Sequence, residues 1–561
     1  MIKKLLAIQT KSVSFASLIL AGSYLLSALL GLLRDRLLAG RFGAGNELDM
    51  YYSAFTVPDF IALILVFGAI SAAIIPIFNS YVIHSKQEAW RYLSILLTTF
   101  LTFLIIVSVI LIIAAPFLIN IIAPGFSPEK KETTVMLMRI MFLSPIILGV
   151  SSIISGILQV FHRFLVTALA PIMYNLGIIT GIIFFVPIFG LKGLAFGVVL
   201  GAVLHLLIQI PAFLYSGFTY QPKIDFGHPG VKKTFILMVP RSLGLGAGQF
   251  NAIVITAIAS TLATGSIAIF NLANTLSSIL INAISISLST AIFPALSSAY
   301  SNFASAKSSK EAREYKKSFE RKFSAGFLQI LFLSIPVSIG IFLLRAQIVR
   351  VILGTGKFTW MDTRLTAACL GIFSLGLCAQ GLIFLLSKTF YAAHNTKIPA
   401  IISVATVLCN ITMSITFVWL LGFTNGFSSF LHAIIKLQSI QNISIVGLSL
   451  AFTITAICEA LLLVFFIHKK LGIFNIRQVL VSVGKMFISG MVMAVVLLSA
   501  RQLLVQFNIV QLQAFWGVFL QLAVSGGLGL VAYVATALIL KSPEIHMIGE
   551  SFFKRFLRTL N

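Results

Sequence analysis

Residues 92–122 read YLSILLTTFLTFLIIVSVILIIAAPFLINII, an apolar run without a charged side chain. A helix needs about 20 apolar residues to cross a hydrocarbon core about 30 Å thick, and this run is long enough. Comparable runs recur from one end of the 561-residue chain to the other. Because backbone polar groups in lipid must hydrogen-bond within their own segment, the pattern predicts a helical bundle embedded in a membrane.

The composition is that of an integral membrane protein. Of all residues, 59% are hydrophobic and 10% are charged, and the mean hydropathy is +1.05, whereas soluble domains are about 25% charged. We expect an all-α fold with about fourteen membrane-spanning helices. The first is long and leads into further spans, so it is not a cleaved signal peptide. The expected ranges are 12–34, 52–83, 92–122, 135–159, 165–188, 192–216, 234–262, 266–296, 322–345, 365–390, 398–421, 443–467, 479–502 and 514–540.

Basic residues greatly outnumber acidic ones, with 40 Lys and Arg against 15 Asp and Glu and a net charge of +25. In a soluble protein this excess would suggest nucleic acid. In a membrane protein, cytoplasmic loops attract Lys and Arg, and that explanation is preferred here. The largest block, KSSKEAREYKKSFERK at 307–322, is expected to form an amphipathic cytoplasmic loop helix. The charge distribution therefore predicts cytoplasmic N- and C-termini and no nucleic-acid partner.

Motifs for enzymatic or ATP-driven chemistry are missing from the sequence. It contains no GxxxxGK[ST], HExxH or GxSxG pattern, which excludes an ATP-driven pump within one chain and predicts a protein without enzymatic activity or cofactor. The cysteines lie in predicted spans without CxxC spacing, so we expect neither a disulfide nor a metal site. They are Cys369, Cys378, Cys409 and Cys458.

Three pairs of segments show an internal repeat with a period of six spans. The pairs are 125–149 with 356–381, 158–175 with 387–410, and 190–197 with 445–452. Because six is even, both copies share one membrane topology, and parallel repeats of this kind form transporters whose two lobes rock around a central site. The expected organisation is an N-lobe at 1–219, a cytoplasmic linker at 220–233, a C-lobe at 234–470, and two further spans with a cytoplasmic tail at 471–561.

The stretch GLLRDRLLAGRFGAGNELDMYYSAFTVPDF at 31–60 resembles the first-span signature of the MurJ (MviN) family of lipid II flippases. Further motifs follow in the family's order: APGF at 123–126, MVPRSLG at 238–244 and FYAAHNTKIP at 390–399. The resemblance covers about residues 5–475. It implies membership of the multidrug/oligosaccharidyl-lipid/polysaccharide exporter superfamily. It also implies transport of undecaprenyl-pyrophosphate-linked lipid II from the inner to the outer leaflet of the bacterial inner membrane, with the prenyl tail remaining among the membrane lipids.

The same resemblance suggests substrate-binding residues. Arginines facing the N-lobe cavity are expected to hold the pyrophosphate, and guanidinium groups suit phosphate because they can bind it with two donors. Arg34 and Asp35 match the family's Arg-Asp pair, Asp49 matches the acidic residue after the FGAG turn, and Arg41 matches a basic position. Arg34 and Arg41 share one helix face if the helix continues through Gly40. Structural pairing at the end of the span remains the alternative for these charges.

The chain departs from the family pattern at positions where arginine is usual. Ala28, Ala62 and Thr275 stand there instead, so the cavity is expected to be less cationic than in typical members. Arg241, near the start of the seventh span, is either a cavity residue that partly replaces the missing charges or an interfacial anchor.

Two polar residues in the second copy are candidates for ion coupling. Glu459 lies inside the twelfth span, where an isolated carboxylate is costly and could bind a proton or sodium ion. Asn410 could add an oxygen from the eleventh span. Against this role, hard cations prefer several oxygen ligands. Asn175 and Asn410 occupy equivalent spans, and both are expected to bridge neighbouring helices.

Four functions remain open at this point. The first is lipid II transport, and the second is transport of another polyprenyl-linked glycan, which the missing arginines favour. A drug/cation antiporter would need a deep carboxylate in the N-lobe, and the sequence shows none in mid-span. The fourth is a membrane scaffold that transports nothing.

Overall fold

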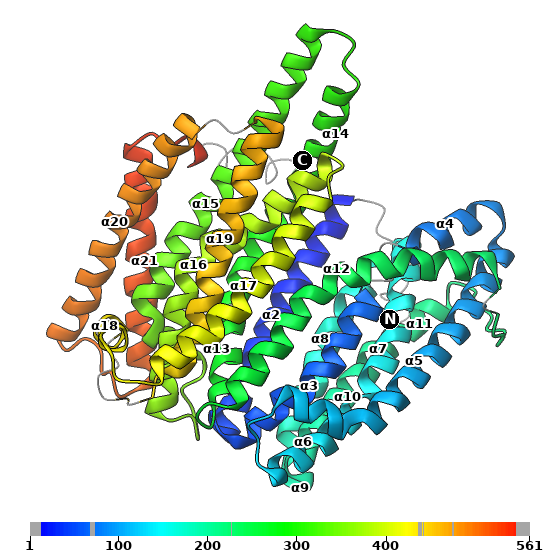
Figure 1. Cartoon of the computed structure of the whole chain (residues 1–561), viewed down its shortest axis with the longest axis horizontal. Coiled ribbons are helices and arrows are strands. Elements are labelled where there is room, and N and C mark those ends of the chain that lie inside the picture. Colours follow the sequence, from blue (N-terminus) through cyan, green and yellow to red (C-terminus); the bar gives the residue numbers. More distant parts are fainter. Residues whose placement is uncertain are drawn as a thin grey trace. The chain divides into compact units, whose positions relative to one another are not determined.

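The computed structural model describes residues 13–67, 73–225, 227–435, 440, 442–473 and 476–545. Within these residues every regular element is a helix, as the all-α prediction requires (Figure 1). The chain forms two compact units. Unit 1 is Met1–Ala268 with Thr355–Phe358, and unit 2 is Ile269–Gly354 with Thr359–Asn561. The predicted division into lobes at 219 and 234 stays a prediction.

Unit 1 is built from the helices that precede residue 261. They are α2 Val13–Phe42, α3 Asn46–Ile61, the π-helical η1 Ala62–Phe67, α4 Ile75–His84, α5 Lys86–Ile122, α6 Pro128–Met141, α7 Leu143–Val160, α8 Phe164–Thr180, the π-helical η3 Gly181–Phe185, α9 Val186–Phe189, α10 Lys192–Leu207, α11 Ile210–Leu214 and α12 Pro229–Ser260. One apolar cluster of this unit joins side chains of α4, α5, α7 and α12.

Unit 2 contains the remaining helices, the first of which begins at the end of unit 1. They are α13 Ser266–Ile281, the π-helical η4 Asn282–Ile286, α14 Ser287–Ala304, α15 Ser309–Ile352, α16 Trp360–Ala392, α17 Lys397–Leu421, α18 Gly426–Ile435, α19 Ser444–Leu471, α20 Ile476–Gln506 and α21 Phe515–Ile539. Helices α14, α15, α16, α19, α20 and α21 enclose its apolar core. Figure 1 shows α20 and α21 side by side.

Eleven helical segments of the described chain are long and apolar enough to cross a membrane. They correspond to all the predicted spans except those at 12–34, 52–83 and 234–262. The first two include residues outside the described part, and the third includes residues whose side chains are not described. Helices α2, α3, α4 and α12 lie within or across these three ranges. The multi-pass helical fold is therefore confirmed, whereas the number fourteen stays a prediction.

The basic block at 307–322 is helical, but it is not a separate loop helix. It forms the first turns of α15, which runs on without a break to Ile352. The Ser308 side chain accepts a hydrogen bond from the Glu311 N–H and so caps the helix start. The helix of the ninth span thus begins at Ser309, thirteen residues before the predicted start at 322.

The first pair of repeated segments begins its helices with the same cap. The Ser127 hydroxyl accepts from the Lys130 N–H at the start of α6, and the Thr359 hydroxyl accepts from the Asp362 N–H at the start of α16. Each hydroxyl satisfies a helix N–H that has no partner within its own helix. The two copies therefore start this helix in the same way.

The second pair shares its turn geometry. His162 after α7 and His394 after α16 adopt left-handed φ angles of 56° and 57°. The next N–H, of Arg163 or Asn395, then donates to the carbonyl five residues earlier, at 2.8 and 2.9 Å respectively. This is the hydrogen-bond pattern of a Schellman helix ending.

The third pair shares a close approach between backbones. A Cβ atom on Gly193 would lie 2.5 Å from backbone atoms of Phe185–Val186, and one on Gly447 would lie 2.9 to 3.0 Å from Phe417–Val418. In each copy a glycine therefore lets one helix pack directly on the backbone of the preceding segment. All three sequence pairs thus have matching local structure.

Candidate functional site

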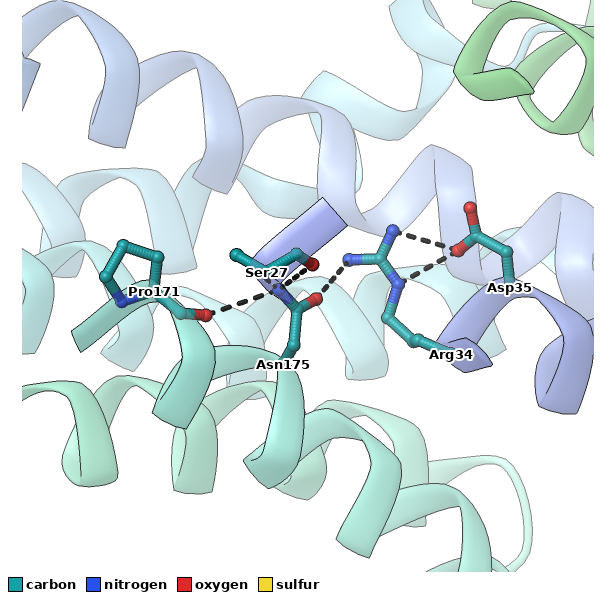
Figure 2. A network of polar contacts seen from close by, with 5 residues as sticks. All are labelled: Ser27, Arg34, Asp35, Pro171 and Asn175. Atoms are coloured by element: carbon teal, nitrogen blue, oxygen red, sulfur yellow. Dashed lines mark hydrogen bonds and ion pairs between the residues drawn. The ribbon is translucent and has the colours of Figure 1, made fainter. Parts of the chain in front are cut away.

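Arg34 is the centre of a polar network inside the helical part of unit 1 (Figure 2). Its Nε donates to Asp35 Oδ1 at 2.9 Å, and its Nη2 lies 2.9 Å from the same oxygen. Its Nη1 donates to Asn175 Oδ1 on α8 at 3.3 Å. The Arg34 side chain is 25% exposed, whereas that of Asp35 is 4% exposed. The guanidinium is thus held on one side and remains accessible on another.

The orientation of Asn175 follows from its other contacts. Its Nδ2 donates to the backbone carbonyls of Ser27 at 3.3 Å and Pro171 at 3.2 Å. Because carbonyls only accept, the amide nitrogen must face them, and the amide oxygen is left to accept from Arg34. Asn175 therefore bridges α2 and α8, as expected from the sequence, and it also positions Arg34.

Three tyrosines near Arg34 were not singled out from the sequence. Tyr51 and Tyr52 on α3 interact electrostatically with Arg34, and Tyr174 on α8 does so as well. Their hydroxyls add hydrogen-bonding groups to an otherwise apolar region. The available signals were the adjacent tyrosines after Asp49 and the Tyr-Asn pair at 174–175.

Asp59 corrects one expectation. No carboxylate was expected in mid-span of the N-lobe. Asp59 nevertheless lies in α3, within the predicted span 52–83, and is half-buried. It accepts a hydrogen bond from Gln249 of α12 at 3.5 Å and interacts electrostatically with Arg34. Asp59 lies three residues before Ala62, one of the positions where arginine is usual in the family.

The other predicted cations of the site are not brought to Arg34 by any described contact. Helix α2 continues through Gly40 to Phe42, so Arg34 and Arg41 do share a helix with the required spacing. Arg41 lies in the last turn and is exposed. Arg241 lies in α12, and its side chain falls outside the described residues. Substrate binding by Arg41 and Arg241 stays a prediction.

Asp49 links the start of α3 to the start of α13. Its Oδ2 accepts from the Gly265 N–H at 2.6 Å, and its Oδ1 accepts from the Ala268 N–H at 2.9 Å. Burial raises the pKa of the Asp49 carboxyl to about 6, although the two backbone donors oppose the rise. Asp49 thus acts as a cap on a helix N-terminus, where a negative charge is favourable.

In the second copy, Asn410 and Glu459 lie along the contact between α17 and α19. Asn410 Nδ2 donates to Thr455 Oγ1 at 3.0 Å, which confirms the expected bridge. Its Oδ1 is buried and has no partner among the described residues. Glu459 lies one turn beyond Thr455 along α19. The described residues contain no group of three or more His, Cys, Asp or Glu side chains suited to a metal ion.

The positions that depart from the family pattern all lie in helices. Ala28 is half-buried in α2, Ala62 is buried as the first residue of η1, and Thr275 is half-buried in α13. None of these side chains can carry charge. Arg34 consequently supplies the positive charge of the network in Figure 2.

An all-helical, multi-pass fold with an internal repeat and a buried arginine network defines a membrane transporter. The family described as "Lipid II flippase MurJ" matches residues 38–519. The chain therefore belongs to the lipid II flippase MurJ family. The matched region extends beyond the predicted limit of 475 and includes all of α20.

Individual relatives agree with this assignment. The chain is 32% identical over 396 residues to a probable lipid II flippase MurJ of Buchnera aphidicola subsp. Acyrthosiphon pisum, covering 70% of this chain and 75% of the relative. It is 25% identical over 543 residues to a probable lipid II flippase MurJ of Vibrio cholerae, covering 94% and 95%.

Solved structures share the fold. A lipid II flippase MurJ in an inward closed conformation superposes with a TM-score of 0.71 at 23% identity, covering 94% of this chain and 100% of that chain. An inward-facing MATE-family multidrug resistance transporter superposes with a TM-score of 0.62 at 15% identity, covering 80% and 94%. Both likenesses show a shared fold.

Proposed function

We propose that this chain is a lipid II flippase, a transporter and not an enzyme, that moves the lipid-linked precursor from the inner to the outer leaflet by alternating access. The observation that carries the proposal is the Arg34 network within a fold of the MurJ family. Arg34 is positioned by Asp35 and Asn175 while a quarter of its side chain stays accessible. A guanidinium carries five N–H donors, so one held in this way would keep donors for a pyrophosphate without losing its orientation.

The direction of transport is physically favourable. With the cytoplasm negative, outward movement of an anion gains about 2.3 kcal/mol per charge per 100 mV. Neutralisation by Arg34 during the crossing would lower the cost of taking the pyrophosphate through a low-dielectric region. Glu459 and Asn410 are the residues through which a sodium ion or proton would couple to the cycle.

Alternating access requires contacts that close one end of the protein and later break. We propose the Asp49 cap as such a contact, because its two hydrogen bonds hold the start of α13, at the end of unit 1, to the start of α3. We assign Asp49 to this closure and Arg34 to the substrate. Asp35 holds Arg34 in place, and Arg41 and Arg241 provide further positive charge for the approaching headgroup.

The proposed location is the bacterial inner membrane with both termini in the cytoplasm. A single cysteine in a background without native cysteines tests this topology. Ser309 is a suitable position, because it is exposed and the neighbouring Ser308 keeps its capping role. Ser309→Cys should resist an impermeant thiol reagent in intact cells, whereas Thr424→Cys should react. The opposite labelling pattern would reverse the topology.

The function itself is tested by growth. Expression of the chain should restore growth to cells depleted of their own lipid II flippase, and failure at normal membrane levels would contradict the proposal. A flippase for another polyprenyl-linked glycan is the second candidate, supported by Ala28 and Ala62. Asp59 and the MATE-like fold support a drug/cation antiporter as the third.

Affinity for purified lipid II separates these candidates. Restoring arginine with Ala28→Arg and Ala62→Arg should tighten binding tenfold or more, about 1.4 kcal/mol, if the cavity is built for pyrophosphate. Unchanged affinity in a folded protein would indicate another cargo. Growth is a poorer measure of these two substitutions. Tighter binding in every state of the transport cycle does not make the cycle faster.

A further inference from the structure

Two adjoining cavities lie in unit 2, away from the Arg34 network. Their volumes are about 540 and 400 Å³, and they share Ala346, Gln347, Trp360 and Arg501 in their walls. The walls come from the end of α15, the start of α16, the end of α20 and the start of α21, with α18 contributing to the smaller cavity. Four membrane helices therefore bring their ends at one side of the bundle to a single polar hollow.

The charge of this hollow is positive. Arg345, Arg350, Arg364 and Arg501 line its walls, and no acidic residue of the described chain does. Arg345 and Arg501 are close enough to interact as like charges. Like charges this close repel one another, and a bound anion would offset that repulsion.

Three of these arginines donate hydrogen bonds to neutral backbone carbonyls. Arg345 Nη1 donates to the Phe342 carbonyl at 2.6 Å, and Arg501 Nη1 donates to the Leu343 carbonyl at 3.1 Å. Arg350 Nη2 donates to a carbonyl of the α20–α21 loop at 3.2 Å. A guanidinium carries five N–H donors, so these bonds fix each side chain while leaving donors for a ligand. None of the three forms an ion pair with a described residue.

A buried amide pair forms the floor beside the arginines. Gln521 Nε2 donates to the Arg501 carbonyl at 3.3 Å, so its Oε1 accepts from Gln347 Nε2 at 3.1 Å. Because a carbonyl cannot donate, both amide orientations are determined, and Gln347 Oε1 is left buried without a partner among the described residues. The two amides thus join α15, α20 and α21 beside the arginines.

The surroundings of the hollow suit an amphiphile better than a soluble anion. Arg350 lies 5.5 Å from the ring centre of Trp360, which is 61% exposed, and tryptophan is enriched at membrane–water interfaces. Exposed apolar side chains continue beside the hollow, with Val505 on α20, Leu512 in the loop that follows it and Phe515 on α21. A headgroup held by the arginines would leave its acyl or prenyl chains against this apolar surface.

We infer that this arginine-lined hollow binds the phosphate group of an anionic lipid. Under the proposed topology it faces the outer leaflet, where basic residues run against the usual cytoplasmic bias, so membrane orientation does not account for them. Two lipids carry the required chemistry, a resident phospholipid such as phosphatidylglycerol and the polyprenyl pyrophosphate of the cargo. The site does not depend on the Arg34 assignment, and binding of phosphatidylglycerol can be tested whether or not the chain transports lipid II.

The test measures binding of fluorescent phosphatidylglycerol to the purified full chain in neutral-detergent micelles. Arg350→Gln with Arg501→Gln should weaken binding tenfold or more, because two charge-assisted contacts to one phosphate are lost. Lys310→Gln with Arg313→Gln removes the same charge from exposed positions at the other end of α15 and should leave affinity unchanged. Equal affinity in both double variants would overturn the inference.

Competitors distinguish the sources of the phosphate. Displacement by polyprenyl pyrophosphate at lower concentration than by unlabelled phosphatidylglycerol would identify the cargo headgroup, and the reverse order would identify a resident phospholipid. Phosphatidylcholine should compete poorly. Arginine-dependent binding of inorganic pyrophosphate without arginine-dependent lipid binding would overturn the lipid assignment. If the glutamine pair does not fold, Arg350→Lys with Arg501→Lys carries the test, with a loss of at least threefold expected from removal of the planar fork.

Discussion

The turns that lead into α8 and α17 are built alike, yet the asparagines that follow them have different partners. His162 and His394 share one left-handed conformation, and the flanking helices end with the same hydrogen-bond pattern. Asn175 then uses its amide oxygen to hold Arg34. Asn410 leaves its amide oxygen buried without a partner among the described residues, while its nitrogen bonds to Thr455, one turn before Glu459 on α19.

This difference shows that the repeat fixes the backbone and not the charge preference of each copy. Caps, turns and glycine contacts recur because they determine where helices begin, end and approach one another. Side chains placed on that framework can then differ at little structural cost. The first copy presents a guanidinium, which favours anions, and the second presents oxygen atoms, which favour cations or protons.

The largest expected effect comes from removing the cation of the first copy. Arg34→Ala should abolish the ability to restore growth in flippase-depleted cells, because no side chain at Ala28 or Ala62 can replace its charge. Arg34→Lys should restore growth only in part, since an ammonium group lacks the planar fork. Growth and the amount of protein in the membrane are measured together.

A structural role for Arg34 has a different signature. Loss of Arg34 leaves the Asp35 carboxylate buried and unpaired, which costs about 3–5 kcal/mol. Arg34→Ala with Asp35→Asn removes that cost, so it should recover membrane levels but not growth. Recovery of both would mean that Arg34 serves only to pair Asp35. Arg91→Ala, at an exposed position on α5, removes the same charge as Arg34→Ala and is the matched control. Cells that depend on this variant should grow normally.

The next effect concerns Asp49, which joins helix starts from the two copies. Its folded-state pKa of about 6 lies above the reference of 3.8, so between these values the folded protein keeps a proton that the unfolded chain releases. The stabilising contribution of this group is therefore complete at pH values below about 4 and is lost as the pH rises through 6. Two pKa units correspond to about 3 kcal/mol.

Unfolding midpoints of detergent-solubilised protein between pH 4.5 and 7 test this linkage. Wild type should lose more stability than Asp49→Asn as the pH rises, although the variant starts from a lower value because its amide group faces two N–H donors. Parallel profiles would show that Asp49 does not titrate in this range. In that case the contact with α13 would be a permanent cap.

A smaller effect tests whether the two copies are packed equally tightly. Gly193→Ala and Gly447→Ala should each destabilise the protein by about 1–3 kcal/mol through overpacking. The loss should be larger at Gly193, where the added Cβ would lie 2.5 Å from backbone atoms, against 2.9 Å at Gly447. Gly484→Ala in α20 meets no atom within 4 Å and is the matched control. A larger loss of thermal stability in Gly447→Ala than in Gly193→Ala would contradict this order.

Sequence reasoning reached the helices and the repeat more easily than the contacts of the site. Apolar length alone predicts spans, and the Arg34–Asp35 pair follows from its motif. By contrast, the donors to Asp49 lie 216 and 219 residues further along the chain, and no local pattern indicates such a distant partner. Tyr51 and Tyr174 were missed for a related reason. Periodicity shows which residues share a face of a helix, but it does not show which neighbouring helix that face contacts.

The smallest expected effect is a sodium response confined to the second copy. If Asn410 and Glu459 contribute to a cation site, sodium should stabilise wild type. At ten times the dissociation constant the free energy of unfolding should rise by about 1.4 kcal/mol, which is measured as a higher unfolding temperature. Potassium at equal ionic strength is the control. Asn410→Leu and Glu459→Gln should both abolish the response. Without sodium, Asn410→Leu should destabilise the protein only slightly. Loss of the hydrogen bond to Thr455 is offset because a buried acceptor without a partner among the described residues is also removed.

Asn175→Leu makes the comparison between the copies complete. It should destabilise the protein at every sodium concentration, since Arg34 loses a partner, but it should leave the size of the sodium response unchanged. Loss of the response in Asn175→Leu as well would place the ion in the first copy or show a general effect of salt. A response that survives in Asn410→Leu and Glu459→Gln would remove both residues from ion coupling. A pH-dependent shift without a sodium response would identify the proton as the ion bound by the second copy.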